Sequence, residues 1–204
     1  MLINTDKMGI LSRDFFNNEN VVFLAKQMLG KKIVSHIDGY ITSGIIVETE
    51  AYRAPEDKAS HAYKNKKTQR TKIMFGKPGT AYIYLIYGFH HLFNIVTAPE
   101  NIAHAVLIRA VEPVDGIDIM LKRRNNLSKD INMTNGPGKW TQAFGITTAL
   151  NGIDLTSGES LIQIHDCGIR ISDDEIIAGP RVGIDYAEEW ALKPWRFRVV
   201  PNQG

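Results

Sequence analysis

The sequence has only one cysteine, Cys167, among its 204 residues. An internal disulfide is therefore excluded, and a reducing compartment is the natural environment for the chain. No uninterrupted apolar run approaches the roughly 20 residues that a membrane-spanning helix needs. The residues after Met1 also lack the apolar segment of a secretory signal. These absences predict an intracellular protein that is neither secreted nor bound to a membrane.

Signals of metal, dinucleotide and serine-nucleophile chemistry are missing as well. The six histidines show no H-E-x-x-H spacing and there is no second cysteine, so no metal site is expected. The G-x-S-x-G elbow and the dinucleotide glycine fingerprint do not occur. The segment around Gly138 and Lys139 is not a Walker A loop, G-x-x-x-x-G-K-[ST]. Met133 stands at the first glycine position of that motif, and Trp140 stands at its final Ser/Thr position. The glycines and Lys139 of this segment still suit a phosphate at a helix N-terminus.

The overall composition is that of an ordinary globular protein. The net charge is +2 and the isoelectric point is about 8.6, which does not by itself indicate a nucleic-acid-binding protein. Hydrophobic residues make up 44% of the chain, enough for a sizeable core. No repeat, low-complexity segment or linker divides the sequence. We expect one domain over residues 1–204, of which residues 1–11 form a loose leader.

The local patterns predict an α/β protein of the α+β type. Helices are expected over residues 12–29, from Pro55, over 115–126 and over 136–144. Strands are expected over residues 31–37, 40–50, 82–87, 89–97, 105–111, 161–165, 169–172, 181–184 and 196–199. The strand segments follow one another too closely for parallel strands with crossover helices throughout. We therefore expect a mostly antiparallel sheet.

The residues that can carry chemistry concentrate between residues 45 and 94. An apolar strand ends with Glu48 and Glu50, which lie on one face because side chains alternate along a strand. Two such carboxylates repel each other unless one is paired, so we expect one structural and one chemical role. Arg109, which interrupts an apolar strand, and Arg53 are the candidate partners. The alternative is that both acids simply face solvent.

A basic segment and a tyrosine-rich strand follow these acids. Between Lys58 and Lys77 there are seven Lys/Arg residues and no acid, which indicates either a solvated loop or a surface for phosphates. Its central part, residues 62–73, is the basic loop. The strand after it places Tyr82 and Tyr84 on one face. Tyr87 falls near an exposed hairpin tip, where a large aromatic side chain suggests an interaction.

Together these residues predict hydrolysis of an N-glycosidic bond on a nucleotide turned out of a duplex. One carboxylate activates a water, and a buried arginine orients the acid or the water. Tyr52, His61 and Tyr84 offer rings on which a planar, electron-poor base can stack. Basic residues hold phosphates, and Tyr87 takes the place of the base that leaves the stack of the duplex. The chemistry is like that of an inverting glycosidase, in which an activated water attacks an oxocarbenium-like sugar.

Long motifs keep a fixed order from about Phe15 to Val199. They are residues 47–52, 55–57, His61, 74–75, 77–80, Tyr82, 84–88, Asn94, 109–113, 135–137 and 181–183. In order and spacing they resemble the alkyladenine DNA glycosylases, the mammalian type of 3-methyladenine DNA glycosylase. The basic loop shares the family's length and charge but few of its residue identities.

The resemblance implies excision of 3-methyladenine, 7-methylguanine, hypoxanthine and ethenoadenine from double-stranded DNA. It implies a monofunctional, monomeric enzyme with no metal and no cofactor, working in the cytoplasm at a bacterial nucleoid or in a nucleus. The implied fold is a single domain around a curved, mostly antiparallel sheet. Helices flank this sheet, and a hairpin protrudes to enter DNA.

The same resemblance assigns roles residue by residue. Glu50 matches the general base, and Arg109 helps to position the water together with a main-chain carbonyl near residues 182–184. The base pocket is matched by Tyr52, His61, Tyr84, Asn94 and Leu107, and Tyr87 matches the side chain that enters the minor groove. Asn94 matches a residue that clashes with the 2-amino group of normal guanine. The expected contacts with the DNA backbone are Lys64, Lys66, Lys67, Arg70, Lys72 and Lys139.

Two other functions stay open at this level. A non-catalytic nucleic-acid-binding domain of similar architecture would need a basic face and exposed aromatics, but not Glu50 and Arg109 together. A hydrolase of free nucleosides would need neither the basic segment nor Tyr87. No general acid for a neutral leaving base is evident in the sequence.

Overall fold

The computed structural model describes residues 9–125 and 133–200, and within them nine strands form one sheet. Every pairing between the named strands is antiparallel. The strands are β1 (Gly9–Ile10), β2 (Lys32–Ile37), β3 (Tyr40–Arg53), β4 (Ala81–Ile86), β5 (His90–Thr97), β6 (His104–Asp115), β7 (Ile162–Asp166), β8 (Ile176–Gly179) and β9 (Arg196–Val199). The predicted antiparallel α+β fold is confirmed.

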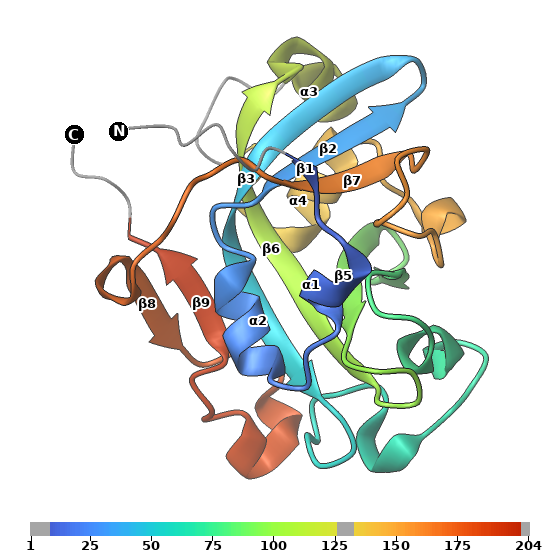
Figure 1. Cartoon of the computed structure of the whole chain (residues 1–204), viewed down its shortest axis with the longest axis vertical. Helices are drawn as coiled ribbons and strands as arrows, with labels where there is room; N and C mark the ends of the chain where they lie inside the picture. The colour runs from blue at the N-terminus through green and yellow to red at the C-terminus, as the bar shows by residue number, and fades with distance from the viewer. Residues whose placement is uncertain (1–8, 126–132, 201–204) are drawn as a thin grey trace.

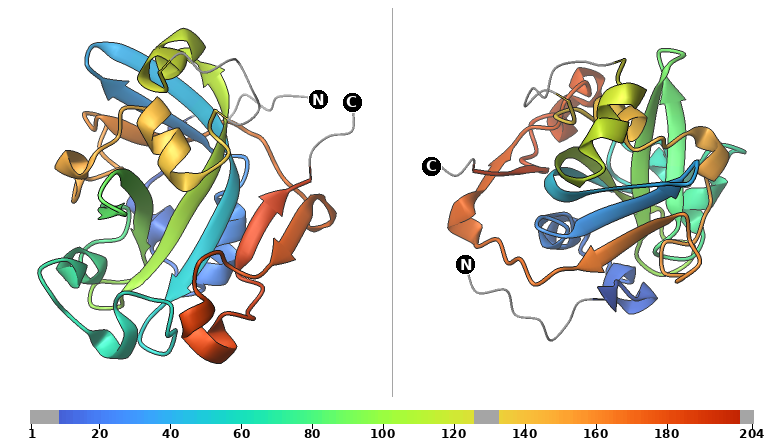
Figure 2. Two further views of the ribbon diagram at one scale, coloured as in Figure 1. Left: turned by 180° about the vertical axis from the view of Figure 1, so that it is seen from behind. Right: turned by 90° about the horizontal axis from the view of Figure 1, so that it is seen from above.

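The order of strands places the two longest ones at the centre. The main path is β1-β7-β2-β3-β6-β5-β4. Strand β9 lies off this path and pairs with both β3 and β8. Figure 1 shows β3 and β6 running side by side through the molecule. The sheet curls around this pair, and the β4–β5 hairpin projects from the body of the protein (Figure 2, right, green).

Short helices cover the sheet. They are α1 (Arg13–Phe16), α2 (Val21–Gln27), α3 (Ile117–Arg123) and α4 (Pro137–Ala143), with 3-10 turns η2 (Tyr63–Asn65), η3 (Thr71–Phe75), η4 (Thr148–Leu150), η5 (Asp173–Glu175) and η6 (Asp185–Trp190). Helix α2 packs on β3 and β6, and α4 packs on β5 and β6. Seen from the front and from behind, they lie on opposite sides of the long strands (Figures 1 and 2). None of the helices in the described ranges is long and apolar enough to cross a membrane.

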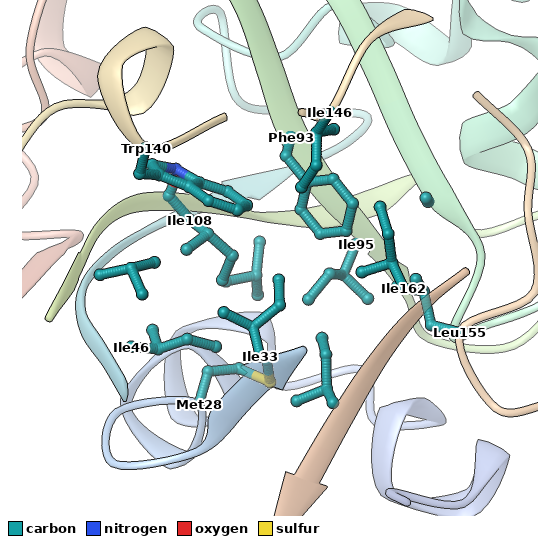
Figure 3. Packing of buried hydrophobic residues seen from close by; sticks show 14 of the residues in the cluster. Met28, Ile33, Ile46, Phe93, Ile95, Ile108, Trp140, Ile146, Leu155 and Ile162 are labelled. Atoms are coloured by element: carbon teal, nitrogen blue, oxygen red, sulfur yellow. The ribbon is translucent and has the colours of Figure 1, made fainter. Parts of the chain in front are cut away.

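Trp140 of α4 anchors the main core. Its ring packs edge-on against Phe93 and Phe144, with centroid distances of 5.5 Å in both pairs. Its indole nitrogen donates to the carbonyl of Ile108 at 3.0 Å, so its polar atom is satisfied although the residue is fully buried. Figure 3 shows Trp140 and Phe93 meeting apolar side chains from β2, β3, β6 and β7. This packing fixes the back of the strands that carry the predicted site.

The helix predicted over residues 12–29 is wrong in its extent. It is interrupted at residues 17–20 and forms α1 and α2. Asn18 accepts a hydrogen bond from the amide of Asn20, and Asn20 accepts one from the amide of Phe23 and caps α2. Asparagine side chains compete with helix formation in this way, and the pattern of apolar residues conceals it.

The helix predicted from Pro55 is also wrong. Residues 54–62 form turns, in which the carboxylate of Asp57 accepts from the amides of Arg53 and Ala59. Asp57 therefore organises a turn instead of a first helical turn. His61 reaches its position through these turns.

Some predictions for the ends and the tail need correction. Residues 169–172 and 181–184 are not strands, and β8 lies at Ile176–Gly179 instead, after a capping box between Ser172 and Glu175. The helix predicted over 115–126 is α3, and residue 126 lies outside the described ranges. Of the predicted leader, residues 1–8 are outside these ranges, whereas Gly9 and Ile10 pair with β7. The hairpins 31–50 and 82–97 are confirmed.

Candidate active site

A cavity of 790 Å³ lies where β3, β4, β5 and β6 meet the segment around η6. The predicted pocket residues Tyr52, His61, Tyr84, Asn94 and Leu107 all line it, together with Arg109 and Tyr87. The structure thus brings together side chains from four strands and a turn. The same cavity is lined by Arg70 and Lys139, two residues predicted at the DNA backbone.

Strand register explains why these side chains meet. Glu50 of β3 pairs with Leu107 of β6, Leu107 pairs with Asn94 of β5, and Asn94 pairs with Tyr82 of β4. Residues paired across antiparallel strands point to the same side of a sheet. The four therefore form one row across four strands. Alternation along each strand indicates the face, but only the register aligns the row.

Glu50 lies behind the wall of the cavity, and its side chain is completely buried. Tyr52 donates its hydroxyl to Oε2 at 2.8 Å, and the amide of Val182 donates to Oε1 at 2.8 Å. The Arg109 guanidinium lies 3.3 Å from Oε1. Burial raises the pKa of Glu50, and Arg109, Tyr52 and Val182 offset only part of this effect. The carboxyl is thus a stronger base than an exposed glutamate, and it is held by two hydrogen bonds and one ion pair.

Arg109 is shared between the two acids of β3. Its Nε lies 3.1 Å from Glu48 and its Nη1 lies 3.3 Å from Glu50. Glu48 also lies 3.7 Å from Arg196 of β9. Irregular register between β3 and β6 on both sides of Glu48 accompanies this arrangement. Arg53, the other candidate partner, pairs instead with Glu56 at 3.5 Å, so that alternative is wrong.

The aromatic residues form a connected wall. The His61 and Tyr84 ring centroids are 4.7 Å apart, and those of Tyr82 and Tyr84 are 5.4 Å apart. His61 Nδ1 lies 2.9 Å from the hydroxyl of Tyr82. Burial, aided by the Arg70 charge, lowers the pKa of His61 to about 4. His61 is therefore a neutral ring at physiological pH, fixed by Tyr82.

Asn94 and Leu107 form the floor between the tyrosine strand and Glu50. Both are almost completely buried. The side-chain amide of Asn94 donates to the carbonyl of Tyr82 at 3.1 Å, across the β4–β5 pair. This bond fixes the orientation of a polar group at the base of a largely apolar cavity.

Tyr87 lies in the turn of the β4–β5 hairpin, as predicted. It is 80% exposed, and Phe89 on the other side of Gly88 is 67% exposed. Tyr87 has a φ of 53°, a left-handed conformation that is uncommon for a bulky residue. Two large aromatic side chains thus stand in solvent at the end of a hairpin, where they contribute little to folding.

The predicted backbone-contacting residues fall into two groups. Lys64, Lys66, Lys67 and Lys72 of the basic loop are exposed, and they are the loop lysines below. Arg70 is also exposed, but its guanidinium lies over the Tyr84 ring, 4.6 Å from its centroid, and it lines the cavity. Lys139 also lines the cavity, and its ammonium donates to Asn135 at 3.0 Å. Arg70 and Lys139 therefore stand between the cavity and the basic surface.

Several residues of the site were not predicted from the sequence. They are Tyr82 as the partner of His61, the amide of Val182 as a donor to Glu50, and the buried pair of Asp57 with Arg181. Main-chain participation near residues 182–184 was expected from a carbonyl, whereas the contact observed with Glu50 is an amide. No three potential metal ligands gather in the described parts of the chain.

Comparison with known proteins identifies the family of the chain. The family model of the methylpurine-DNA glycosylases matches residues 14–203. A protein of Chlamydia felis with the provisional name 3-methyladenine DNA glycosylase is 51% identical over 189 residues, which cover 92% of this chain and 95% of that protein. Proteins of Bacillus cereus (49% over 188 residues; 89% and 92%) and Chlamydia pneumoniae (48% over 196 residues; 96% and 97%) carry the same provisional name. The chain belongs to the methylpurine-DNA glycosylase family of DNA repair hydrolases.

Proposed function

We propose that this glycosylase removes 3-methyladenine, 7-methylguanine, hypoxanthine and ethenoadenine from duplex DNA, and that Glu50 activates the attacking water. The observation that carries the mechanism is the buried carboxylate of Glu50 behind the aromatic cavity, with two hydrogen-bond donors and the Arg109 guanidinium next to it. The enzyme works as a monomer inside the cell and leaves an abasic site.

Binding begins with the exposed basic and aromatic surface. The loop lysines neutralise phosphates without reading sequence. Tyr87, which stands free at the hairpin end, enters the duplex as the nucleotide turns out. Turning out a base costs a few kcal/mol, and less where the base is damaged or mispaired, so selection starts before the pocket is reached.

The turned-out purine then stacks in the cavity. Tyr52, His61 and Tyr84 present their rings, and a cationic alkylpurine is attracted to the electron-rich faces of the tyrosines. Asn94, held by the carbonyl of Tyr82, excludes the 2-amino group of normal guanine. A methylated purine that carries a positive charge is already a good leaving group.

Hydrolysis follows from the electrostatics around Glu50. The raised pKa makes the carboxylate a better proton acceptor, and the nearby charge of Arg109 opposes part of that rise by favouring the ionised form. Arg109 also orients the water, with the main chain near Val182. A neutral purine such as hypoxanthine needs a proton at the leaving base, and His61, with a pKa of about 4, does not supply it.

The test is excision from a duplex with one hypoxanthine and from a methylated duplex, both in EDTA. We expect strand breaks only after alkali, since a monofunctional enzyme leaves an intact backbone. Breaks before alkali would contradict monofunctional chemistry. Binding without breaks on either substrate would favour a non-catalytic nucleic-acid-binding domain. Release of bases from free nucleosides at a comparable rate would favour a nucleoside hydrolase.

A further inference from the structure

A buried ion pair lies next to Tyr52, one of the residues that hold the proposed general base. The side chains of Arg181 and Asp57 are both completely buried. The Arg181 guanidinium donates to both carboxylate oxygens of Asp57, at 2.5 and 2.8 Å. It also donates to the carbonyls of Ala51 at 2.8 Å and Trp190 at 3.2 Å. One guanidinium thus joins β3, the turns of residues 54–62 and η6, which are far apart in the sequence.

The Arg181 guanidinium is connected to both hydrogen-bond donors of Glu50, the Tyr52 hydroxyl and the Val182 amide. It lies 4.7 Å from the centroid of the Tyr52 ring, whose hydroxyl donates to Glu50. The next residue, Val182, donates its amide to the other oxygen of Glu50. One donor is therefore packed against Arg181 and the other is covalently attached to it. The planar, two-pronged contact with Asp57 fixes the direction of the guanidinium, which a lysine ammonium cannot do.

We propose that Arg181, held by Asp57, is a positioning residue that fixes the Tyr52 hydroxyl and the Val182 amide on the carboxylate of Glu50. This inference rests on the proposed function of Glu50 as the general base. A buried ion pair is itself a weak source of stability, since an apolar pair of similar volume often stabilises a fold equally well. Its effect on the geometry around Glu50 is therefore separable from its effect on folding.

The consequence is a defined change in pH dependence. Hydrogen bonds from Tyr52 and Val182 favour the ionised carboxylate and lower the pKa of Glu50 against the effect of burial. Loosening both bonds raises that pKa further, so the rate falls at a higher pH than in the wild type. The other ionisable groups around Glu50 are Glu48 on β3, Arg109 on β6, Tyr84 on β4 and Arg196 on β9 beside Glu48. Within the described residues, none of these groups makes a hydrogen bond or an ion pair with Asp57.

The experiment compares single-turnover excision of hypoxanthine at saturating enzyme over a range of pH. The double variant Asp57→Asn/Arg181→Met removes both charges, so no unpaired charge is buried and the Asn oxygen still accepts from Ala59. The variant Arg181→Lys keeps the positive charge but loses the two-pronged hydrogen bonding to the Asp57 carboxylate. The control Asp166→Asn, on β7, breaks the ion pairs of Asp166 with Lys31 at 3.2 Å and with Arg170 at 2.8 Å. Thermal unfolding is recorded for each.

We expect both site variants to lose about tenfold or more in rate at neutral pH and to shift the acid limb upward by about one pH unit, as loss of a bond to a charged group implies. The control is expected to lower Tm without moving the acid limb. If the double variant does not fold, Arg181→Lys decides alone. If the wild type is active and the folded variants show the same acid limb of the pH–rate profile as the wild type, the positioning role is overturned. A wild type that leaves the lesion in place would refute the proposed function itself.

Discussion

Replacing Glu50 by glutamine removes the proposed base while nearly preserving its surroundings. The glutamine oxygen can occupy the Oε1 position, where it accepts from Val182 and lies next to Arg109. The glutamine nitrogen then faces the Tyr52 hydroxyl, which can rotate to accept instead of donating. Arg109 keeps its contact with Glu48. The geometry therefore allows Glu50→Gln to fold and to bind damaged DNA.

The loss of activity should be large, because a positioned general base contributes about 10²- to 10⁴-fold. This corresponds to about 3–5 kcal/mol in the activation free energy. The assay is single-turnover excision of hypoxanthine from duplex DNA, read as alkali-sensitive breaks, next to fluorescence anisotropy of the same duplex. We expect the rate to fall by that factor and the Kd to change little.

Glu48→Gln is the matched control. It neutralises a carboxylate two residues away on the same face, and Arg109 retains Glu50 as its partner. We expect a much smaller loss of rate than for Glu50→Gln. Residual Glu50→Gln activity within about tenfold of the wild type, or equal losses in the two variants, would refute the assignment of Glu50 as the base.

Glu50→Gln should also change the stability of the fold, and the direction of the change follows from the raised pKa of Glu50. The pKa of Glu50 is raised in the folded protein, so the folded state holds its proton more tightly than the unfolded state. The contribution of Glu50 to stability therefore declines as pH rises from about 4.5 through the folded pKa. Glu50→Gln should raise Tm at neutral pH, and the difference should shrink as the pH falls toward 4.5. The wild-type excision rate should fall over the same acid range.

Three further perturbations test the surrounding surface. Tyr87→Ser should leave Tm unchanged, because Tyr87 is 80% exposed. It should weaken binding to a lesion and slow excision from duplex DNA. A variant as fast as the wild type would contradict insertion of Tyr87 into the duplex. Changing the four loop lysines to alanine should weaken binding to damaged and undamaged DNA alike. The slope of log K against log salt concentration should fall by about 0.9 per lost phosphate contact. An unchanged slope would favour a merely solvated loop. Arg70→Gln should raise the pKa of His61 above about 4 in an NMR titration, because a nearby positive charge is removed, and an unchanged pKa would assign the depression to burial alone.

The main features of the fold follow from local sequence patterns. Alternating residues in 31–50 and 82–97 indicate hairpins, and the Asp38-Gly39 turn matches the left-handed conformation of both residues. The tip position of Tyr87 follows directly from Gly88. What the periodicity conceals is local competition by polar side chains. Asn18 and Asn20 interrupt the first helix, and Asp57 turns the chain where Pro55 indicated a helix.

The candidate site is predictable to the extent that it lies on strands. Arg109 was found because its charge interrupts an apolar strand, and Glu48 and Glu50 because two acids end another. The resemblance to the alkyladenine DNA glycosylases then assigned the base to Glu50 and a pocket wall to Tyr84. The row from Glu50 to Tyr82 depends on the relative register of four strands, which no single segment encodes. Asp57 and Arg181 are 124 residues apart, and each is an ordinary charged residue in a loop. Only the fold reveals that they are completely buried together.

The paired acids at the end of β3 act on each other through one arginine. Burial alone would raise the pKa of Glu50, and Arg109 opposes this most strongly among the groups around it. Glu48 draws the same guanidinium toward itself at 3.1 Å and adds a like charge, so it weakens that opposition. Arg196 partly compensates Glu48 from β9. Glu48 thus has a structural contact and an electrostatic consequence, since its charge helps to raise the pKa of Glu50, in the direction that the proposed general-base role requires.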